Sequence, residues 1–196
     1  WRIIRINSNG SVRIIYDGTS AHNNGEFFSD RSIGEAQFNS NFDNNMYVGY
    51  MYESGNAHGK TKSSIIKTII DEWYENNLIN YDSRIDNTVG FCGDRSTLNL
   101  QHDAGTGIVD TYYKAYLRIQ KSMPTLTCEN TLDYYSTSYA LTGNKSLKYS
   151  IGLITADEVM FAGHAGGIFD GIYNKMYASI DNYLTNENYY WLMTPA

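Results

Sequence analysis

The chain has 196 residues, 42% of them hydrophobic and 14% aromatic, and a formal net charge of −6 at pH 7. This length fits one domain with an ordinary hydrophobic core, so we expect residues 1–196 to form a single domain. The net negative charge and the lack of a basic stripe argue against nucleic acid as a partner. The sequence contains no apolar run of about 18 residues, which is the length that spans a membrane.

The N-terminal residues predict a β-hairpin. Two isoleucine-rich runs, WRIIRI at 1–6 and SVRIIY at 11–16, are joined by NSNG, and an Asn-Gly pair between such runs is the strongest short hairpin signal. Because both runs are apolar at nearly every position, we expect strands that are buried on both faces or central in a sheet. Strand 1–6 then needs a second neighbour, for which the candidates are 151–154, 189–193, a strand beyond Ala196 or a neighbouring copy of the chain.

The next part of the chain predicts a loop, a strand and a long helix. Residues 17–45 are dense in Asn, Gly, Ser and Asp and predict a long loop, whereas MYVGYMY at 46–52 predicts a strand. Apolar residues at the helical period predict a helix over 62–78, with Ser63 as its cap. The face expected to pack on the sheet consists of Ile65, Ile66, Ile69, Ile70 and Trp73.

The second half predicts one further helix. Residues 111–120 fit either a short helix or a strand, and IGLI at 151–154 fits a buried strand or an extended approach. Thr155 and Glu158 have the spacing of a capping box, which predicts a short helix over 155–163. The element order predicts an α+β fold, with a mixed or antiparallel sheet, one long and one short helix, and long loops.

Cys92 and Cys128 are the two cysteines of the chain, and three interpretations compete for them. Zinc sites use closely spaced ligand pairs, which are missing here. A nucleophilic Cys92 would need a histidine base and a third group that orients it, and no family signature of such a site appears. Asn, Ser, Thr, Gly and Tyr supply most of the polarity, as in many extracellular proteins, where disulfides persist. We therefore expect a Cys92–Cys128 disulfide, which closes a loop of 36 residues.

Other polar residues carry weaker signals. HDAG, which contains His102 and Asp103, resembles a fragment of a catalytic loop, and Asp94 lies nearby in the sequence. A histidine beside glycine is more often a surface turn residue, so we assign no catalytic residue. Asp- and Asn-rich segments lack the EF-hand spacing, so we also assign no metal or cofactor. Tyrosines in loops could form a contact surface for carbohydrate or protein.

Several motifs together resemble a known module. They are the opening WRII, IGLITADE at 151–158 and the closing YWLMTP, and the likeness covers nearly the whole chain. The chain resembles a module of surface proteins from anaerobic Gram-positive gut bacteria, in which no catalytic residues are established. The resemblance implies a fold like that of C-type lectins and formylglycine-generating enzymes. Because the chain begins at Trp1 without a methionine and ends on YYWLMTPA without a polar tail, we expect it to be a segment of a longer precursor.

The sequence departs from that family in two respects. Family members usually continue into a final strand that closes the sheet beside the first strands, whereas this sequence stops at WLMTPA. Formylglycine-generating enzymes use closely spaced cysteines late in the chain, an arrangement that Cys92 and Cys128 do not match.

We expect a non-enzymatic extracellular or cell-surface module for adhesion, ligand binding or filament building. Its partners would be a protein or carbohydrate surface ligand, or neighbouring copies of itself, with no nucleic acid and no membrane insertion by this segment. One alternative is an extracellular hydrolase or oxidase that uses Asp94, His102 and Asp103. Another alternative is a structural subunit of a phage or pilus.

Overall fold

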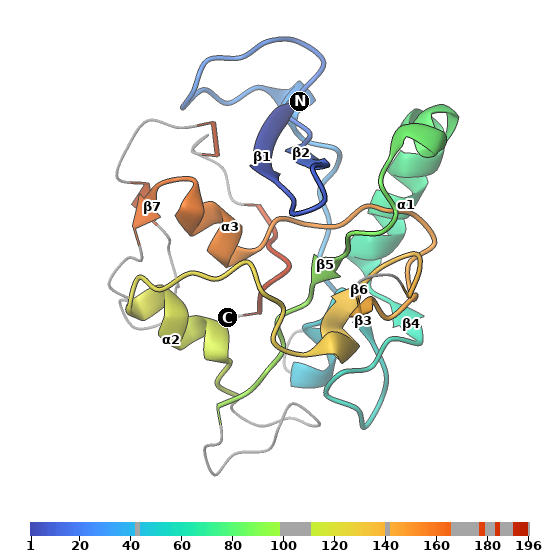
Figure 1. Ribbon diagram of the computed structural model, residues 1–196, viewed down its shortest axis with the longest axis vertical. Coiled ribbons are helices and arrows are strands. Elements are labelled where there is room, and N and C mark those ends of the chain that lie inside the picture. The colour runs from blue at the N-terminus through green and yellow to red at the C-terminus, as the bar shows by residue number, and fades with distance from the viewer. Residues whose placement is uncertain are drawn as a thin grey trace.

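The computed structural model describes residues 1–41, 44–98, 111–139, 142–165, 177–178, 183–184 and 190–195. Helices and short antiparallel strand pairs both occur in these residues, which confirms the predicted α+β class. Figure 1 shows α1 on one side of the molecule and α2 with α3 on the other, with the pairs β1–β2 and β5–β6 between them. In this described part of the chain, no helix is long and apolar enough to cross a membrane.

The secondary structure consists of short elements joined by long loops. The α-helices are α1 (Ile65–Asn77), α2 (Lys114–Gln120) and α3 (Ala156–Phe161). The 3₁₀ helices are Ser29–Arg31, Asn45–Tyr47, Ile79–Arg84 and Thr131–Asp133. The strand pairs are β1 (Arg2–Ile6) with β2 (Val12–Ile15), β3 (Met51–Tyr52) with β4 (Lys62–Ser63), β5 (Phe91–Cys92) with β6 (Tyr134–Tyr135), and β7 (His164–Ala165) with β8 (Tyr177–Ala178).

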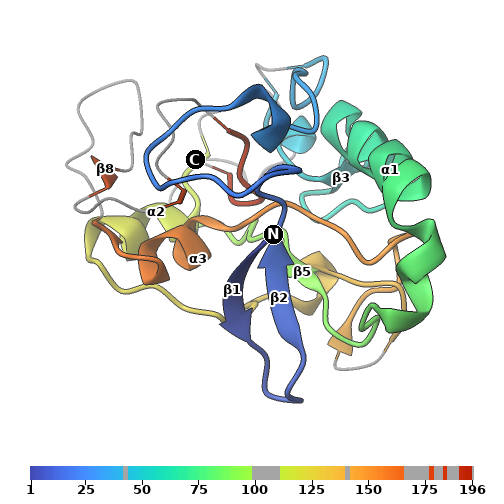
Figure 2. The ribbon, with the colours of Figure 1, turned by 90° about the horizontal axis from the view of Figure 1, so that it is seen from above.

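The N-terminal hairpin forms as predicted, and it projects at one edge of the molecule in Figure 2. Gly10 takes a φ of +84° in the turn, a left-handed conformation that glycine adopts without steric cost. The register pairs Ile3 with Ile14 and Ile6 with Val12, and it shifts between Ile3 and Arg5. This β-bulge places an extra residue in β1 and changes which side chains share a face.

The bulge explains why the prediction of two buried faces is wrong. Ile3 and Ile6 both lie on the outer face, where they are 63% and 73% exposed, and their partners Val12 and Ile14 are about half exposed. Ile4 and Ile15 instead pack against the core residues Ile154, Val159 and Leu184. One face of the hairpin is therefore apolar and exposed, and the other is packed on the protein. Within the described residues, β1 pairs with β2 alone.

The two internal candidates for a third strand meet each other instead of β1. Residues 151–154 form no strand, and the carbonyl of Ile154 accepts a hydrogen bond from the amide of Met193 at 2.9 Å. The described part of the other candidate, 190–193, forms no strand either. An expected strand at 46–52 is present only as Met51–Tyr52, because Asn45–Tyr47 forms a 3₁₀ turn.

Helix α1 is shorter than predicted and buries a different row of side chains. Ser63 belongs to β4, and the cap is Ser64, whose side chain accepts a hydrogen bond from the amide of Lys67. The face buried against the protein consists of Ile66, Lys67, Ile70 and Tyr74. Ile65 is 37% exposed and therefore contradicts the predicted face, whereas Trp73 packs against the rings of Trp1 and Tyr16.

A single central cluster holds α1 to the strand pairs. Ile66 and Ile70 of the helix join Met51 of β3 and Tyr135 of β6 in this cluster. Tyr50, Leu147 and Met193 complete its buried part. The second half of the molecule is held by α2 and α3, which contact each other through Ile119, Ala156 and Met160. Residues 111–120, for which helix and strand were both open, thus supply a helix.

Candidate functional site

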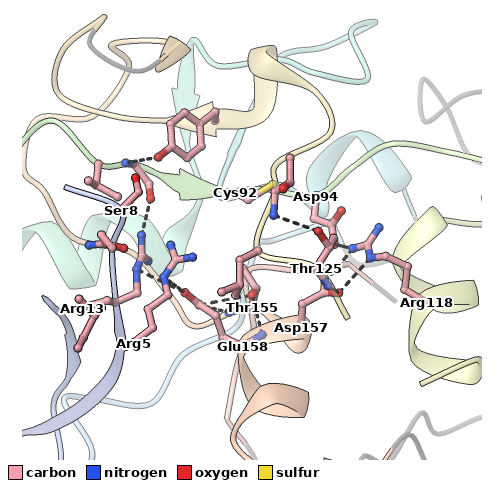
Figure 3. A pocket seen from close by; sticks show the side chains of 17 residues that line it. Arg5, Ser8, Arg13, Cys92, Asp94, Arg118, Thr125, Thr155, Asp157 and Glu158 are labelled. Carbon is pink, nitrogen blue, oxygen red and sulfur yellow. Dashed lines mark hydrogen bonds and ion pairs between the residues drawn. The ribbon is translucent and has the colours of Figure 1, made fainter. Parts of the chain in front are cut away.

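A pocket of about 290 Å³ lies under the hairpin, and Figure 3 shows the side chains that line it. Its walls are the end and turn of the hairpin at residues 6–8, segment 89–94 and segment 125–127. The start of α3 contributes Thr155, Asp157 and Glu158, and α2 contributes Arg118. We call this site the arginine pocket, because Arg5, Arg13 and Arg118 line it.

The predicted disulfide is present and belongs to this site. Cys92 and Cys128 are bonded, with their Cα atoms 5.4 Å apart, a usual separation for a disulfide. Cys92 lines the pocket, and Cys128 directly follows the wall segment 125–127. The bond therefore ties this wall to β5. Because both sulfurs are used in the bond, neither cysteine is a zinc ligand or a nucleophile in this state.

The predicted capping box is also present and positions an acidic side chain in the pocket. The Thr155 hydroxyl accepts a hydrogen bond from the amide of Glu158 at 3.1 Å, and Oε2 of Glu158 accepts one from the amide of Thr155 at 3.0 Å. The other carboxylate oxygen, Oε1, lies 3.3 Å from Nε of Arg5 and 3.4 Å from Nε of Arg13. A local helix cap thus presents one carboxylate to two arginines of the hairpin.

The two hairpin arginines form one end of the pocket. The Arg13 guanidinium lies over the Phe91 ring, 4.2 Å from its centroid, and donates a hydrogen bond to the carbonyl of Gly90. Burial lowers the pKa of Arg13 although Glu158 opposes this, and the neighbouring charge of Arg5 lowers it further. Two positive charges therefore share a single carboxylate at this end.

The opposite end has two carboxylates and one arginine. Nε and Nη2 of Arg118 donate to the two oxygens of Asp157 at 3.0 and 2.8 Å, and Nη2 also donates to Oδ2 of Asp94. The amide of Thr125 donates to Oδ1 of Asp157 at 2.9 Å. Arg118 therefore connects α2, the start of α3 and the segment that follows β5.

Asp94 has two unusual properties at this end. Burial raises its pKa to about 6 against the opposing charge of Arg118, and the nearby carboxylate of Asp157 raises it further. Its φ of +53° lies in the left-handed region, which is uncommon for residues other than glycine and is found more often at functional sites. A buried carboxyl group with a shifted pKa in a pocket is a candidate functional group.

The structure places only part of the predicted hydrolase or oxidase site. Asp94 lies in the arginine pocket, whereas His102 and Asp103 lie outside the described residues. Sequence reasoning missed the three arginines and Asp157 as site residues. The capping box spacing predicted the role of Glu158 in the helix cap, but it did not predict the contacts of Glu158 with Arg5 and Arg13.

The pocket contains groups for binding polar molecules. Guanidinium groups donate hydrogen bonds, carboxylates accept them, and the hydroxyls of Ser8, Thr125, Thr127 and Tyr134 can do both. Among the described residues that line the pocket there is no histidine. Nor do the described residues contain a group of three His, Cys, Asp or Glu side chains that could hold a metal ion.

No family model matches the chain, and no similar curated protein or solved structure was found. The C-type-lectin-like fold and the resemblance to a bacterial surface module therefore stay predictions.

Proposed function

We propose that this chain is an extracellular, non-enzymatic binding module, and that the arginine pocket holds a small polar ligand. The observation that carries this proposal is a pocket that is lined by charged side chains and whose walls are linked to one another. The Cys92–Cys128 bond, the α3 capping box and the Arg118 bridge hold three of its walls. Prearranged polar groups bind with a smaller loss of conformational entropy than mobile ones. The disulfide supports an extracellular location, because such bonds persist in oxidising compartments.

Binding is favoured over catalysis by the way the charged groups are used. Both oxygens of Asp157 accept hydrogen bonds, and Glu158 is shared between its helix cap and two arginines. A general base needs access to the proton that it removes, and a nucleophile needs such a base beside it. Asp157 and Glu158 instead hold walls of the pocket together and are not free to act as a general base. Asp94 is the group that would supply acid–base chemistry in the alternative enzyme.

The proposal is tested by recording amide NMR spectra during titration with small polar probes. D-glucose, glucuronate and glycine cover neutral, anionic and zwitterionic chemistry. We expect at least one probe to shift the amide signals of Gly90 and Thr125, and the Arg118→Gln variant to lose these shifts. Lys148→Gln is the control, because Lys148 is exposed and pairs with the exposed Glu75. If no probe moves these signals, the pocket is not a binding site. If a probe is converted to product, the enzyme alternative is correct.

A second candidate function, assembly with neighbouring copies, is favoured by the outer face of the hairpin. Ile3, Ile6, Val12 and Ile14 lie on this face and are all exposed. Neighbouring exposed aliphatic side chains are typical of protein contact surfaces. This arrangement would suit adhesion, a filament, or a structural subunit of a phage or pilus.

Sedimentation velocity over a range of concentrations tests the assembly. We expect association that increases with concentration and is weakened by the double variant Ile3→Thr/Ile14→Thr. Ile79→Thr is the control, because Ile79 is 43% exposed and lies in the 3₁₀ helix after α1. Electron microscopy then separates closed oligomers from fibres. A monomer at every concentration would contradict this second function.

A further inference from the structure

The charges of the arginine pocket are balanced in number but separated in space. Among the described residues, three arginines and three carboxylates line it, so their formal charges sum to zero. Figure 3 shows Arg5 and Arg13 at one end, Arg118 with Asp94 at the other, and Thr155 between the two groups. A pocket of this kind favours a ligand with two opposite charges over a ligand with one charge.

The hairpin end has an excess of hydrogen-bond donors and positive charge. Arg5 and Arg13 share a single oxygen of Glu158, at 3.3 and 3.4 Å, and the second oxygen is used by the amide of Thr155. Nε of Arg5 is buried and faces Oε1 of Glu158, but it makes no hydrogen bond to the described residues. A carboxylate or phosphate would supply acceptor oxygens with the geometry that guanidinium groups prefer.

The opposite end has an excess of negative charge. Within the described part of the chain, Arg118 is the one arginine that contacts the two carboxylates there, and its bonds to Asp157 already occupy both oxygens of that group. Asp94 contacts Arg118 through Oδ2. The raised pKa of Asp94 has the same cause, because burial and the nearby Asp157 disfavour a second negative charge there. An ammonium group beside these carboxylates would offset that excess.

We propose that the arginine pocket binds a small zwitterion, with an anionic group against Arg5 and Arg13 and an ammonium group against Asp94, beside Asp157. This inference rests on the proposed binding function and specifies its ligand. The volume of about 290 Å³ lies at the lower end for ligand pockets, which suits a molecule of amino-acid size. The anion could be the carboxylate of an amino acid or the phosphate of an amino alcohol.

Isothermal titration calorimetry with matched probes tests the charge pattern. Glycine, 4-aminobutyrate and 6-aminohexanoate vary the distance between the two charges, and phosphoethanolamine replaces the carboxylate with a phosphate. Butyrate and butylammonium each carry one charge, and D-glucose carries none. We expect the best zwitterion to bind at least about tenfold more tightly than either singly charged probe. Comparing phosphoethanolamine with the amino acids decides between the two sources of the anion.

Two variants test which end of the pocket binds which charge. We expect Arg5→Gln to weaken the binding of butyrate but not of butylammonium, and Asp94→Asn to weaken the binding of butylammonium but not of butyrate. Both should weaken the zwitterion, whereas the surface variant Lys148→Gln should not. Circular dichroism and thermal melting establish that each variant is folded. If a variant fails to fold, the order of probe affinities for the wild type decides by itself.

The two proposals fail in different ways. If D-glucose or a singly charged probe binds as tightly as the best zwitterion, this inference is overturned and the binding function stands. If no probe binds, both proposals are overturned.

Discussion

Arg95 and Asp133 form an ion pair inside the molecule, with Nη2 of Arg95 2.6 Å from Oδ1 of Asp133. Both side chains are almost completely buried. Arg95 also donates to the carbonyls of Met51 and Gly59 and to the hydroxyl of Tyr135. One guanidinium group thus links β3, the loop that follows β3, and β6.

Removal of one member of this pair should strongly destabilise the protein. The remaining charge would be buried without its partner, which typically costs about 3–5 kcal/mol. We expect this loss in the free energy of unfolding for Arg95→Met, and a comparable loss for Asp133→Leu, measured by urea denaturation. Lys148→Gln, which removes an exposed ion pair, should leave the unfolding curve unchanged. A similar small effect for the buried variants would contradict the structural role of the pair.

The raised pKa of Asp94 predicts a pH-dependent stability. Its pKa is about 6 in the folded protein against 3.8 as the ordinary value, so the folded state binds more protons between these pH values. The contribution of Asp94 to stability is therefore complete below pH 3.8 and is lost as the pH rises through about 6. As the pH rises over this range, we expect the free energy of unfolding of wild type to fall by about 1–3 kcal/mol relative to that of Asp94→Asn.

Measuring the free energy of unfolding of wild type and of Asp94→Asn at several pH values tests this prediction.

The pKa of Asp133 is shifted in the opposite direction. Burial would raise this pKa, but hydrogen bonds from His58 and Arg95 and the charge of Arg95 outweigh burial and lower it. Its contribution is present above the ordinary pKa of 3.8 and is lost as the pH falls through the folded-state pKa. A parallel pH dependence of wild type and Asp94→Asn between pH 4 and 6 would refute the raised pKa.

The disulfide should contribute substantially to stability. It closes a 36-residue loop, for which the chain-entropy account gives roughly 3–4 kcal/mol. We expect the double variant Cys92→Ala/Cys128→Ala to lose about this much by chemical denaturation. Mass spectrometry of native protein should show a gain of two hydrogen atoms on reduction. Two thiols that react with an alkylating agent before reduction would contradict the bond.

The face that α1 buries can be tested with two isoleucines of the same helix. Ile70 is 3% exposed, so Ile70→Ala should cost about 2–5 kcal/mol through lost burial and the cavity left behind. Ile65 is 37% exposed, and Ile65→Ala should cost less than about 1 kcal/mol. Thermal and urea unfolding measure both changes. Equal losses would mean that both rows are buried, as the sequence pattern predicted.

Removing the capping hydroxyl of α3 should moderately lower the stability of the protein, and a serine hydroxyl at the same position should restore it. Thr155→Ala removes the acceptor for the amide of Glu158 and should cost about 1 kcal/mol. Thr155→Ser keeps an acceptor and should stay close to wild type. Because Glu158 also contacts Arg5 and Arg13, the Ala variant should in addition shift NMR signals in the hairpin. An unchanged melting temperature for Thr155→Ala would contradict the role of this cap.

Features that depend on neighbours in the sequence were predictable. The Asn-Gly turn and the Thr155–Glu158 cap each involve residues two to four positions apart, so short-range geometry determines them. The disulfide followed from having two cysteines in a chain of extracellular composition. The helical period located α1 because it depends on residue spacing alone.

Tertiary packing decided the rest. The period of α1 allows several buried faces, and the side that meets Met51 and Tyr135 determines which row is covered. The apolar pattern of the hairpin fits burial of both faces, but the bulge near Ile4 puts Ile3 and Ile6 outside together. The arginine pocket joins residues that are 24 and 39 positions apart around Arg118, and residues more than 140 positions apart around Glu158. Such contacts depend on how distant segments pack, which local sequence patterns do not encode.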